Sequence, residues 1–268
     1  MKEKRPTDIC IIGSGNVATH LARAWHAAGV EIRAVCSPTP GHAEALADGV
    51  GAKAFHSLES LPAAAAYVLC VKDDALPAVA ARLVAQLPAN GALVAHTAGS
   101  VGLDALPANG CGRAVIYPLQ TFTKGRELDL SRVPFLVEGG TEDALCKAEW
   151  LAGRISRDVR PLDSEGRRKL HLAAVFANNF TNHCLALAER LAAEAGLDGS
   201  LLRPILRETL RKAETMPARE AQTGPAVRWD ETVMRRQHDA LAARPEAQAV
   251  YDAVSRSIHA LAEEKTEG

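Results

Sequence analysis

The sequence predicts an α/β domain, with a mainly parallel sheet and helices on both faces, followed by an all-α domain. Short apolar runs alternate with amphipathic segments of helical period from residue 9 to about residue 162. Beyond that point the chain shows only helical patterns. Near its start, a glycine-rich turn joins the first strand to the first helix. We therefore expect two domains, over residues 1–160 and 161–268.

The first strand and helix enclose the turn GSGNVA, which has the form G-x-G-x-x-A. Gly13 allows a tight reversal of the chain, and Gly15 has no side chain to keep a pyrophosphate away from the backbone. Ala18 lets the helix pack close to its strand, and the N-terminus of the helix offers free N–H groups to a phosphate. Because the turn lies between a buried strand and a helix, it favours a Rossmann dinucleotide site over an ordinary strand–helix turn.

The second strand, expected at residues 32–36, indicates which dinucleotide binds. An acidic residue usually ends this strand in NAD-specific folds, where its carboxylate holds the ribose hydroxyls. Here Ser37, Pro38 and Thr39 follow the strand, with His42 as the nearest candidate cation. Two hydroxyls without a carboxylate favour NADP over NAD; a plain turn is the alternative. The predicted cofactor-binding residues are Gly13, Ser14, Gly15, Asn16, Val17, Ser37, Thr39, Val71 and Lys72.

The rest of the first domain continues the alternation of strands and helices. We expect strands at residues 52–55, 67–71, 92–95, 114–116, 134–137 and 159–162, and helices at 42–47, 77–87 and 141–154. Ligands of a parallel sheet bind beyond the carboxyl ends of its strands. The segments that follow the strands are therefore expected to surround one crevice, at residues 13–17, 37–39, 71–73, 96–100 and 117–121.

Composition excludes several classes of protein. Hydrophobic residues make up 47% and charged residues 24% of the 268 residues, as in ordinary globular proteins. The net charge of −1 gives no electrostatic case for a nucleic acid or a membrane partner. No apolar run approaches the roughly 20 residues that span a bilayer. The charged start of the chain leaves no room for a signal peptide, and six cysteines without a C-x-x-C pair predict neither a metal site nor disulfides. A cytoplasmic protein is expected.

The second half is expected to begin with one long helix over residues 164–195, followed by helices over residues 201–216, 230–243 and 245–264. The middle of the long helix, residues 172–177, is apolar all round, which predicts burial on several sides. His171, Asn178 and Asn182 are seven and four residues apart and so share one face. This stripe either faces the nucleotide crevice or forms a hydrogen-bonded seam between helices.

The motifs GSGNVA, CVKDDAL, HTAGS, YPLQTF, LHLAAVFANNFTNH and TGPAVRWD resemble a family of bacterial Rossmann-type proteins that are assigned as NADP oxidoreductases and carry a helical C-terminal domain of unknown function. The resemblance extends from residue 9 to about residue 251. The wider superfamily includes 6-phosphogluconate dehydrogenases, pyrroline-5-carboxylate reductases and β-hydroxyacid dehydrogenases, whose helical halves form dimers. The resemblance therefore implies a homodimer. Trp229 and Pro38 stand where the family usually has glycine and arginine.

These observations predict an NADP(H)-dependent oxidoreductase that transfers hydride between NADPH and a small carbonyl, imine or hydroxy compound. β-Hydroxyacid dehydrogenases use a lysine where this chain has Ala174 or Val175, so a non-catalytic NADP-binding sensor or scaffold is the alternative. Histidine exchanges protons near neutrality, with an unperturbed pKa of ~6.5, and His171 is the predicted acid, with His96 as its rival. The predicted catalytic residues are His171, Asn178, Ser100 and His96, and the predicted substrate-binding residues are Thr97, Gly99, Asn182 and Arg228.

Overall fold

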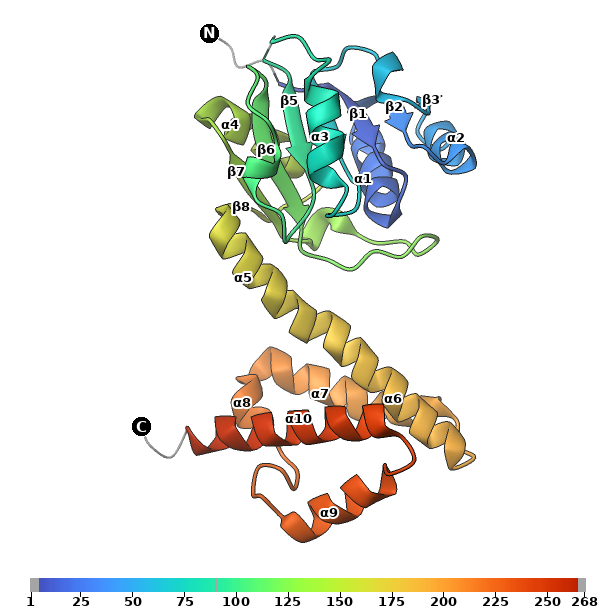
Figure 1. Ribbon diagram of the computed structural model, residues 1–268, viewed down its shortest axis with the longest axis vertical. Coiled ribbons are helices and arrows are strands. Elements are labelled where there is room, and N and C mark those ends of the chain that lie inside the picture. The colour runs from blue at the N-terminus through green and yellow to red at the C-terminus, as the bar shows by residue number, and fades with distance from the viewer. Residues whose placement is uncertain (1–4, 90, 265–268) are drawn as a thin grey trace. The chain divides into compact units, whose positions relative to one another are not determined.

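Figure 1 shows the computed structural model of the chain, which describes residues 5–89 and 91–264. The described residues fall into two compact units, of which the first ends at Asn179 and the second begins at Phe180. The first unit contains the sheet and the second unit is helical. Among the described residues, no helix has both the length and the apolar character needed to cross a membrane.

One sheet of eight described strands forms the centre of the first unit, in the order β3-β2-β1-β4-β5-β6-β7-β8. The strands are β1 Asp8–Ile12, β2 Glu31–Cys36, β3 Lys53–Phe55, β4 Ala66–Leu69, β5 Leu93–His96, β6 Gly112–Pro118, β7 Phe135–Gly139 and β8 Val159–Pro161. Every neighbouring pair is parallel except β6 and β7. This confirms the predicted mainly parallel sheet. The strand order reverses between β1 and β4, and a crevice for a dinucleotide forms at such a switch point.

Helices cover both faces of this sheet (Figure 1). They are α1 Asn16–Ala27, α2 Pro40–Asp48, α3 Leu76–Val84 and α4 Glu142–Gly153, with short 3₁₀ turns η1 Leu58–Ser60, η2 Leu103–Ala105 and η3 Leu130–Arg132. A further helix, α5 Ser164–Ala174, follows β8 and leads away from the sheet (Figure 1). Residues of β1 alternate between two apolar clusters: Ile9 packs with α1, α2 and α4, whereas Cys10 packs with α3. Because successive side chains of a strand point to opposite faces, β1 contributes to a separate hydrophobic core on each face of the sheet.

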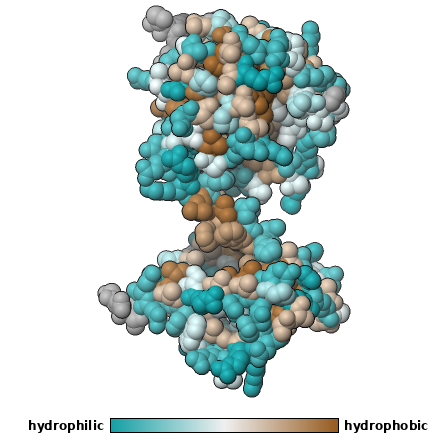
Figure 2. All heavy atoms as spheres, viewed as in Figure 1, coloured by the Kyte–Doolittle hydropathy of each residue, from teal (hydrophilic) through white to brown (hydrophobic). Residues whose placement is uncertain are grey.

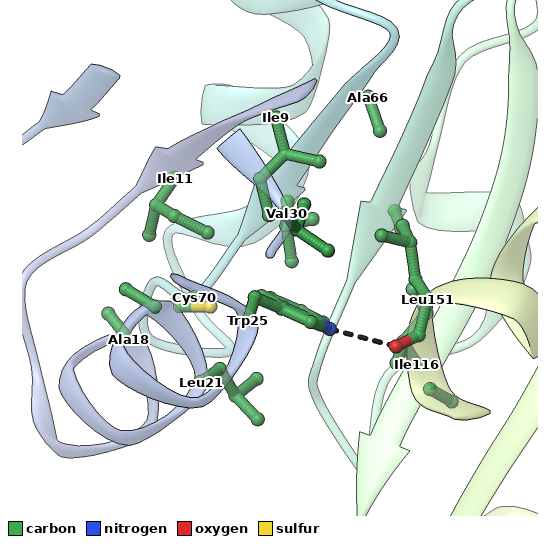
Figure 3. Packing of buried hydrophobic residues seen from close by; sticks show 14 of the residues in the cluster. Ile9, Ile11, Ala18, Leu21, Trp25, Val30, Ala66, Cys70, Ile116 and Leu151 are labelled. Atoms are coloured by element: carbon green, nitrogen blue, oxygen red, sulfur yellow. Dashed lines mark hydrogen bonds between the residues drawn. The ribbon is translucent and has the colours of Figure 1, made fainter. Parts of the chain in front are cut away.

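Trp25 joins two helices on one face of the sheet (Figure 3). Its side chain is fully buried, and Nε1 donates a hydrogen bond of 2.8 Å to the carbonyl oxygen of Leu151 in α4. A buried indole N–H needs such a partner, and the net contribution of one hydrogen bond is about 1 kcal/mol. This contact fixes α1, and with it the glycine-rich turn, against the sheet.

The predicted long helix is helical throughout, but it is not uniform. After α5 the chain forms a π-helix, η4 Val175–Phe180, and then α6 Thr181–Glu194. The prediction that residues 172–177 are buried on several sides is wrong for the single chain, because Leu172 and Phe176 are 59% and 62% exposed. Arg167 and Leu170 pack against the sheet, but Leu172 lies on another side of the helix. Hydrophobic surface is visible along this stretch in Figure 2.

The second unit consists of α6, η5 Gly199–Leu202, α7 Arg203–Thr215, α8 Ala218–Ala221, α9 Glu231–Ala240 and α10 Pro245–Glu263. Together with the sheet of the first unit, this confirms the predicted fold class. Trp229 lies in the loop before α9 and is the one non-glycine residue of the described chain with a positive φ, of 51°. Its ring packs on His259, with ring centroids 4.6 Å apart.

Candidate functional site

The glycine-rich turn after β1 is held between two other strands. Gly13 N–H donates to the carbonyl oxygen of Cys36 at 2.8 Å, and Cys70 N–H donates to the carbonyl oxygen of Ile12 at 2.7 Å. Gly13 has a φ of +112°, and a Cβ there would lie 2.5 Å from the carbonyl oxygen of Cys70. Only glycine fits this close crossing without strain. The turn therefore lies at the switch point of the sheet.

The start of α1 is open to a ligand. Gly15 is exposed, and a Cβ on this residue would meet no atom within 4 Å. No side chain caps the helix, and its first turn holds no acidic residue. Ala18 is fully buried, so the helix packs close to the sheet as predicted. An uncapped helix N-terminus beside open space fits the diphosphate of a dinucleotide.

The segment after β6 folds back onto α1. Asn16 Nδ2 donates to the carbonyl oxygen of Phe122 at 2.9 Å, and His20 Nε2 lies 3.0 Å from the carbonyl oxygen of Thr123. The rings of His20 and Phe122 are 5.3 Å apart. Asn16 is therefore tied to a loop, while the neighbouring Val17 is half-buried. On the other side of the turn, the half-buried Val71 and the exposed Lys72 follow β4.

The hydroxyls after β2 differ in their availability. Ser37 is buried, and its Oγ accepts hydrogen bonds from Ser14 Oγ at 2.9 Å and from Thr39 N–H at 3.4 Å. Thr39 itself is exposed at the start of α2. His56, which the sequence did not single out, has Nδ1 3.3 Å from the carbonyl oxygen of Ser37. Thr39 is thus the more accessible of the two predicted phosphate ligands, and His56 adds a second histidine near them.

His96 and Thr97 are internal hydrogen-bonding residues at the end of β5. His96 is fully buried: its Nδ1 accepts from Ala98 N–H at 3.2 Å, and its Nε2 donates to the carbonyl oxygen of Gly102 at 3.2 Å. Burial, reinforced by the nearby charge of Arg167, lowers the pKa of His96 to about 4. Thr97 is also buried, with Oγ1 3.4 Å from the carbonyl oxygen of Leu69. His96 is therefore neutral at pH 7, with both ring nitrogens in use.

A second histidine is paired with a tyrosine next to Gly99. The hydroxyl of Tyr117, near the end of β6, lies 3.0 Å from His171 Nδ1, and the two rings meet edge to face at 5.8 Å. A Cβ on Gly99 would lie 2.5 Å from His171 Nδ1 and 2.7 Å from Tyr117 Cζ. Gly99 thus allows the pair to form. Burial raises the pKa of Tyr117, so its hydroxyl stays protonated at neutral pH.

Ser100 and Asp73 connect the loops after β5 and β4. Ser100 Oγ donates a hydrogen bond to Asp73 Oδ2. Both residues are exposed, so the pair lies at the surface of the crevice rather than in the core. The charge of Asp73 also acts to raise the pKa of Tyr117, behind the larger effects of burial and Arg167. Ser100 directly follows Gly99, against which the Tyr117–His171 pair packs.

Arg167, one turn before His171, fixes α5 to the sheet. Its guanidinium is fully buried and binds the carboxylate of Glu138 in β7, the carbonyl oxygen of Val101 at 2.7 Å and Ser164 Oγ at 3.2 Å. Ser164 Oγ also donates to Glu138 at 2.7 Å. Removing one partner of such a buried ion pair leaves an uncompensated charge. The cluster sets the position of the helix and hence of His171.

A cavity of about 380 Å³ opens beside this pair, in the first unit. Its polar lining consists of Tyr117, Gln120, Thr121, His171, Asn178 and Asn179. The structure therefore brings two of the predicted residues, His171 and Asn178, to one cavity, with Gly99 packed behind them. Asn182 in α6 and Arg228 before α9 are exposed residues of the second unit. Sequence reasoning missed Tyr117, Asp73 and Arg167, although Tyr117 follows a strand in the predicted crevice.

Family models match two parts of the chain. Residues 8–99 match the model described as NADP oxidoreductase, coenzyme F420-dependent, and residues 133–258 match a domain of unknown function. The two matches correspond to the nucleotide-binding half of the sheet and to the last strands with the helical region. No curated protein matches the chain.

Solved structures match nearly the whole chain. A Bacteroides fragilis protein assigned as an NADP oxidoreductase is 38% identical, with 95% of this chain and 98% of that chain covered and a TM-score of 0.88. A Thermotoga maritima protein is 23% identical, covering 96% of this chain and 99% of that one, with a TM-score of 0.71. A pyrroline-5-carboxylate reductase from Coxiella burnetii shares the fold at 15% identity, with 97% and 98% coverage and a TM-score of 0.57. The chain thus belongs to the family of Rossmann-type NADP oxidoreductases with a C-terminal domain of unknown function, as its motifs predicted.

Proposed function

We propose that the protein is an NADP(H)-dependent oxidoreductase that transfers hydride between NADPH and a small carbonyl, imine or hydroxy compound. The observation that carries this proposal is the Tyr117–His171 pair, which lines a cavity near the carboxyl end of β6. A titratable group in such a cavity is the arrangement expected of an active site. The assignment of the Bacteroides fragilis relative supports the reaction class.

The glycine-rich turn would hold the cofactor. The N-terminus of α1 and the open side of Gly15 suit the diphosphate, and Gly13 allows the close crossing with Cys70 that shapes the turn. Thr39, with Ser37 beneath it, would contact the 2′-phosphate, while Val71 and Lys72 would border the nucleotide. Ser37, Pro38 and Thr39 directly follow β2 in place of the carboxylate that usually ends this strand in NAD-specific folds, which favours NADP over NAD.

When bound, NADPH supplies the hydride, and the chain must supply the proton. Nε2 of His171 has no hydrogen-bond partner within the described chain, whereas Nδ1 is held by Tyr117. A tyrosine hydroxyl can either donate to Nδ1 or accept from Nδ1–H, so it holds the ring in one orientation in both protonation states. His171 would therefore donate a proton from Nε2 to the substrate oxygen or nitrogen as negative charge develops there. Asn178 and Ser100 would orient the substrate.

The function is tested by following NADPH oxidation with a panel of aldehydes, ketones and imines. His171→Ala should lower kcat by about a hundredfold with an unchanged Kd for NADPH, because only proton transfer is lost. His26→Ala, an exposed histidine on α1, is the matched control and should keep full activity. Full activity of His171→Ala would refute the assigned acid. NADPH binding without turnover of any compound would favour the alternative of a non-catalytic NADP-binding sensor or scaffold.

We also infer that the protein is a homodimer. Large apolar side chains are exposed along the helical region, including Leu172 (59%), Phe176 (62%), Leu201 (63%), Ile205 (66%) and Leu210 (63%). Monomeric proteins rarely leave so many large apolar side chains in water. A second copy of the chain would cover them, and helical halves form dimers in the wider superfamily that the sequence resembles. The helical half would then serve both dimerisation and substrate binding.

A further inference from the structure

The chemistry of the cavity limits the class of substrate. Building on the proposed function, we propose that the cavity accepts an uncharged carbonyl compound, with an apolar body and a neutral hydrogen-bonding group, in preference to a carboxylate. Three observations support this: the described lining holds no lysine, arginine, aspartate or glutamate, the buried Arg167 is paired with Glu138, and amide side chains line the cavity.

The lining is divided between apolar and uncharged polar side chains. The apolar part comes from the segment after β6, from α5 and from η4, and consists of Leu119, Leu170, Ala173, Ala174, Val175 and Ala177. Among the described residues that line the cavity there is no lysine, arginine, aspartate or glutamate. A carboxylate that leaves water for such a site loses its hydration without gaining a lysine or arginine partner, which is costly; protonated His171 is the one cation that the described lining can offer it. A neutral ligand bears much less of this cost.

Two cations of α5 near the cavity are already engaged in ion pairs. The charge of Arg167 acts on Tyr117, but its guanidinium is buried against Glu138, so the pair adds little net charge. Lys169 points into solvent and binds Glu165 at 2.6 Å. Asp73 accepts a hydrogen bond from Ser100, and its negative charge acts on Tyr117 as well. An anion here disfavours a second negative charge.

Amide side chains supply the polar recognition. The side chains of Asn178 and Asn179 have no hydrogen-bond partner in the described part of the chain, and Gln120 uses only its carbonyl oxygen, which accepts from Thr121 N–H at 2.8 Å. An amide offers both donors and an acceptor, whereas a carboxylate can only accept. Primary amides and hydroxyls use both functions of an asparagine. The lining is therefore complementary to a neutral group that donates and accepts.

The binding test uses 4-methylpentanamide and 4-methylpentanoate, which have the same shape and differ in charge. Calorimetry on the full chain with NADPH should show the amide binding about tenfold more tightly or better. Methyl NMR signals of Leu119 and Val175 should shift with the amide. Equal or tighter binding of the carboxylate, or no binding of the amide, would overturn the proposal.

Substitutions at one position separate charge from shape. Asn178→Lys places a cation in the cavity and should reverse the preference toward the carboxylate. Asn178→Leu, the matched control, should weaken amide binding without any gain for the carboxylate. If Asn178→Lys keeps the wild-type preference while its fold, checked by circular dichroism, is intact, then the missing cation does not set the specificity and the proposal fails.

Turnover distinguishes this inference from the proposed function. The rate of reduction by NADPH is compared for 4-methyl-2-oxopentanamide and 4-methyl-2-oxopentanoate. Faster reduction of the amide supports both the proposed function and the proposed substrate class. Faster reduction of the carboxylate would keep the oxidoreductase function and overturn the substrate class. Preferential binding of the neutral probe, without reduction of either compound, would keep the substrate class and contradict the proposed reduction of these two compounds by NADPH.

Discussion

Acid should destabilise the fold through His96, by an amount that follows from its environment. The pKa of His96 is lowered from 6.5 to about 4, mainly by burial. As the pH falls, the unfolded chain therefore takes up this proton before the folded chain does. The stability linked to His96 is complete above pH 6.5, declines below it, and is fully lost only below the folded pKa. A gap of about 2.5 pH units corresponds to about 3 kcal/mol in all, of which about 2 kcal/mol falls between pH 7 and pH 5.

Urea unfolding at these two pH values measures this loss. Other groups also titrate, so the wild type is compared with His96→Asn, which keeps a donor and an acceptor but does not titrate. The free energy of unfolding of the wild type should fall by about 2 kcal/mol more than that of the variant. NMR titration of the His96 ring gives its pKa directly. A pKa near 6.5, or equal losses in both proteins, would refute the buried neutral histidine and restore His96 as a candidate acid.

Two further expectations follow from the turn and from the exposed helices. Gly13→Ala should lower the stability by about 2 kcal/mol, since its Cβ would lie 2.5 Å from the carbonyl oxygen of Cys70 at a φ of +112°. Gly15→Ala has open space at its Cβ, so it should keep the Tm but bind NADPH more weakly; equal losses of Tm would contradict this reading. Light scattering should give about twice the chain mass of 28.4 kDa, because Leu172 and Ile205 leave apolar surface to cover. A monomer mass at micromolar concentration would remove the dimer.

The sequence was sufficient for the fold because local patterns determine its main features. The turn from Gly13 to Ala18 and the alternation of buried strands with helices require parallel pairing and helices on both faces. The direction of β7 was not predictable, since an apolar run of five residues packs equally well in either orientation. Periodicity also failed at η4: spacing arguments assume 3.6 residues per turn, and a π-helix has a wider turn. The spacing from His171 to Asn182 therefore does not establish a common face.

The candidate site was only partly predictable because its contacts join distant segments. His171 was identified as a polar residue in an apolar helix, but nothing local indicates that Tyr117 holds its ring. Likewise, the role of Ser37 changes once Ser14 donates to it, because a hydroxyl that looks like a ligand becomes part of the turn. The chemistry of a single side chain follows from its residue type. The partner that decides how that side chain is used depends instead on how distant segments pack together.

The close crossing of Gly13 and Cys70 has a consequence for the order of folding. β1 and β4 are neighbours in the sheet, but β2, β3 and two helices separate them along the chain. Pairing them closes a long loop, and contacts of this kind form slowly. The glycine-rich turn can therefore mature only after this non-local pairing, late in the assembly of the sheet. A dinucleotide that binds the finished turn would then stabilise the pairing of β1 with β4, by an amount that rises with the free concentration of the nucleotide.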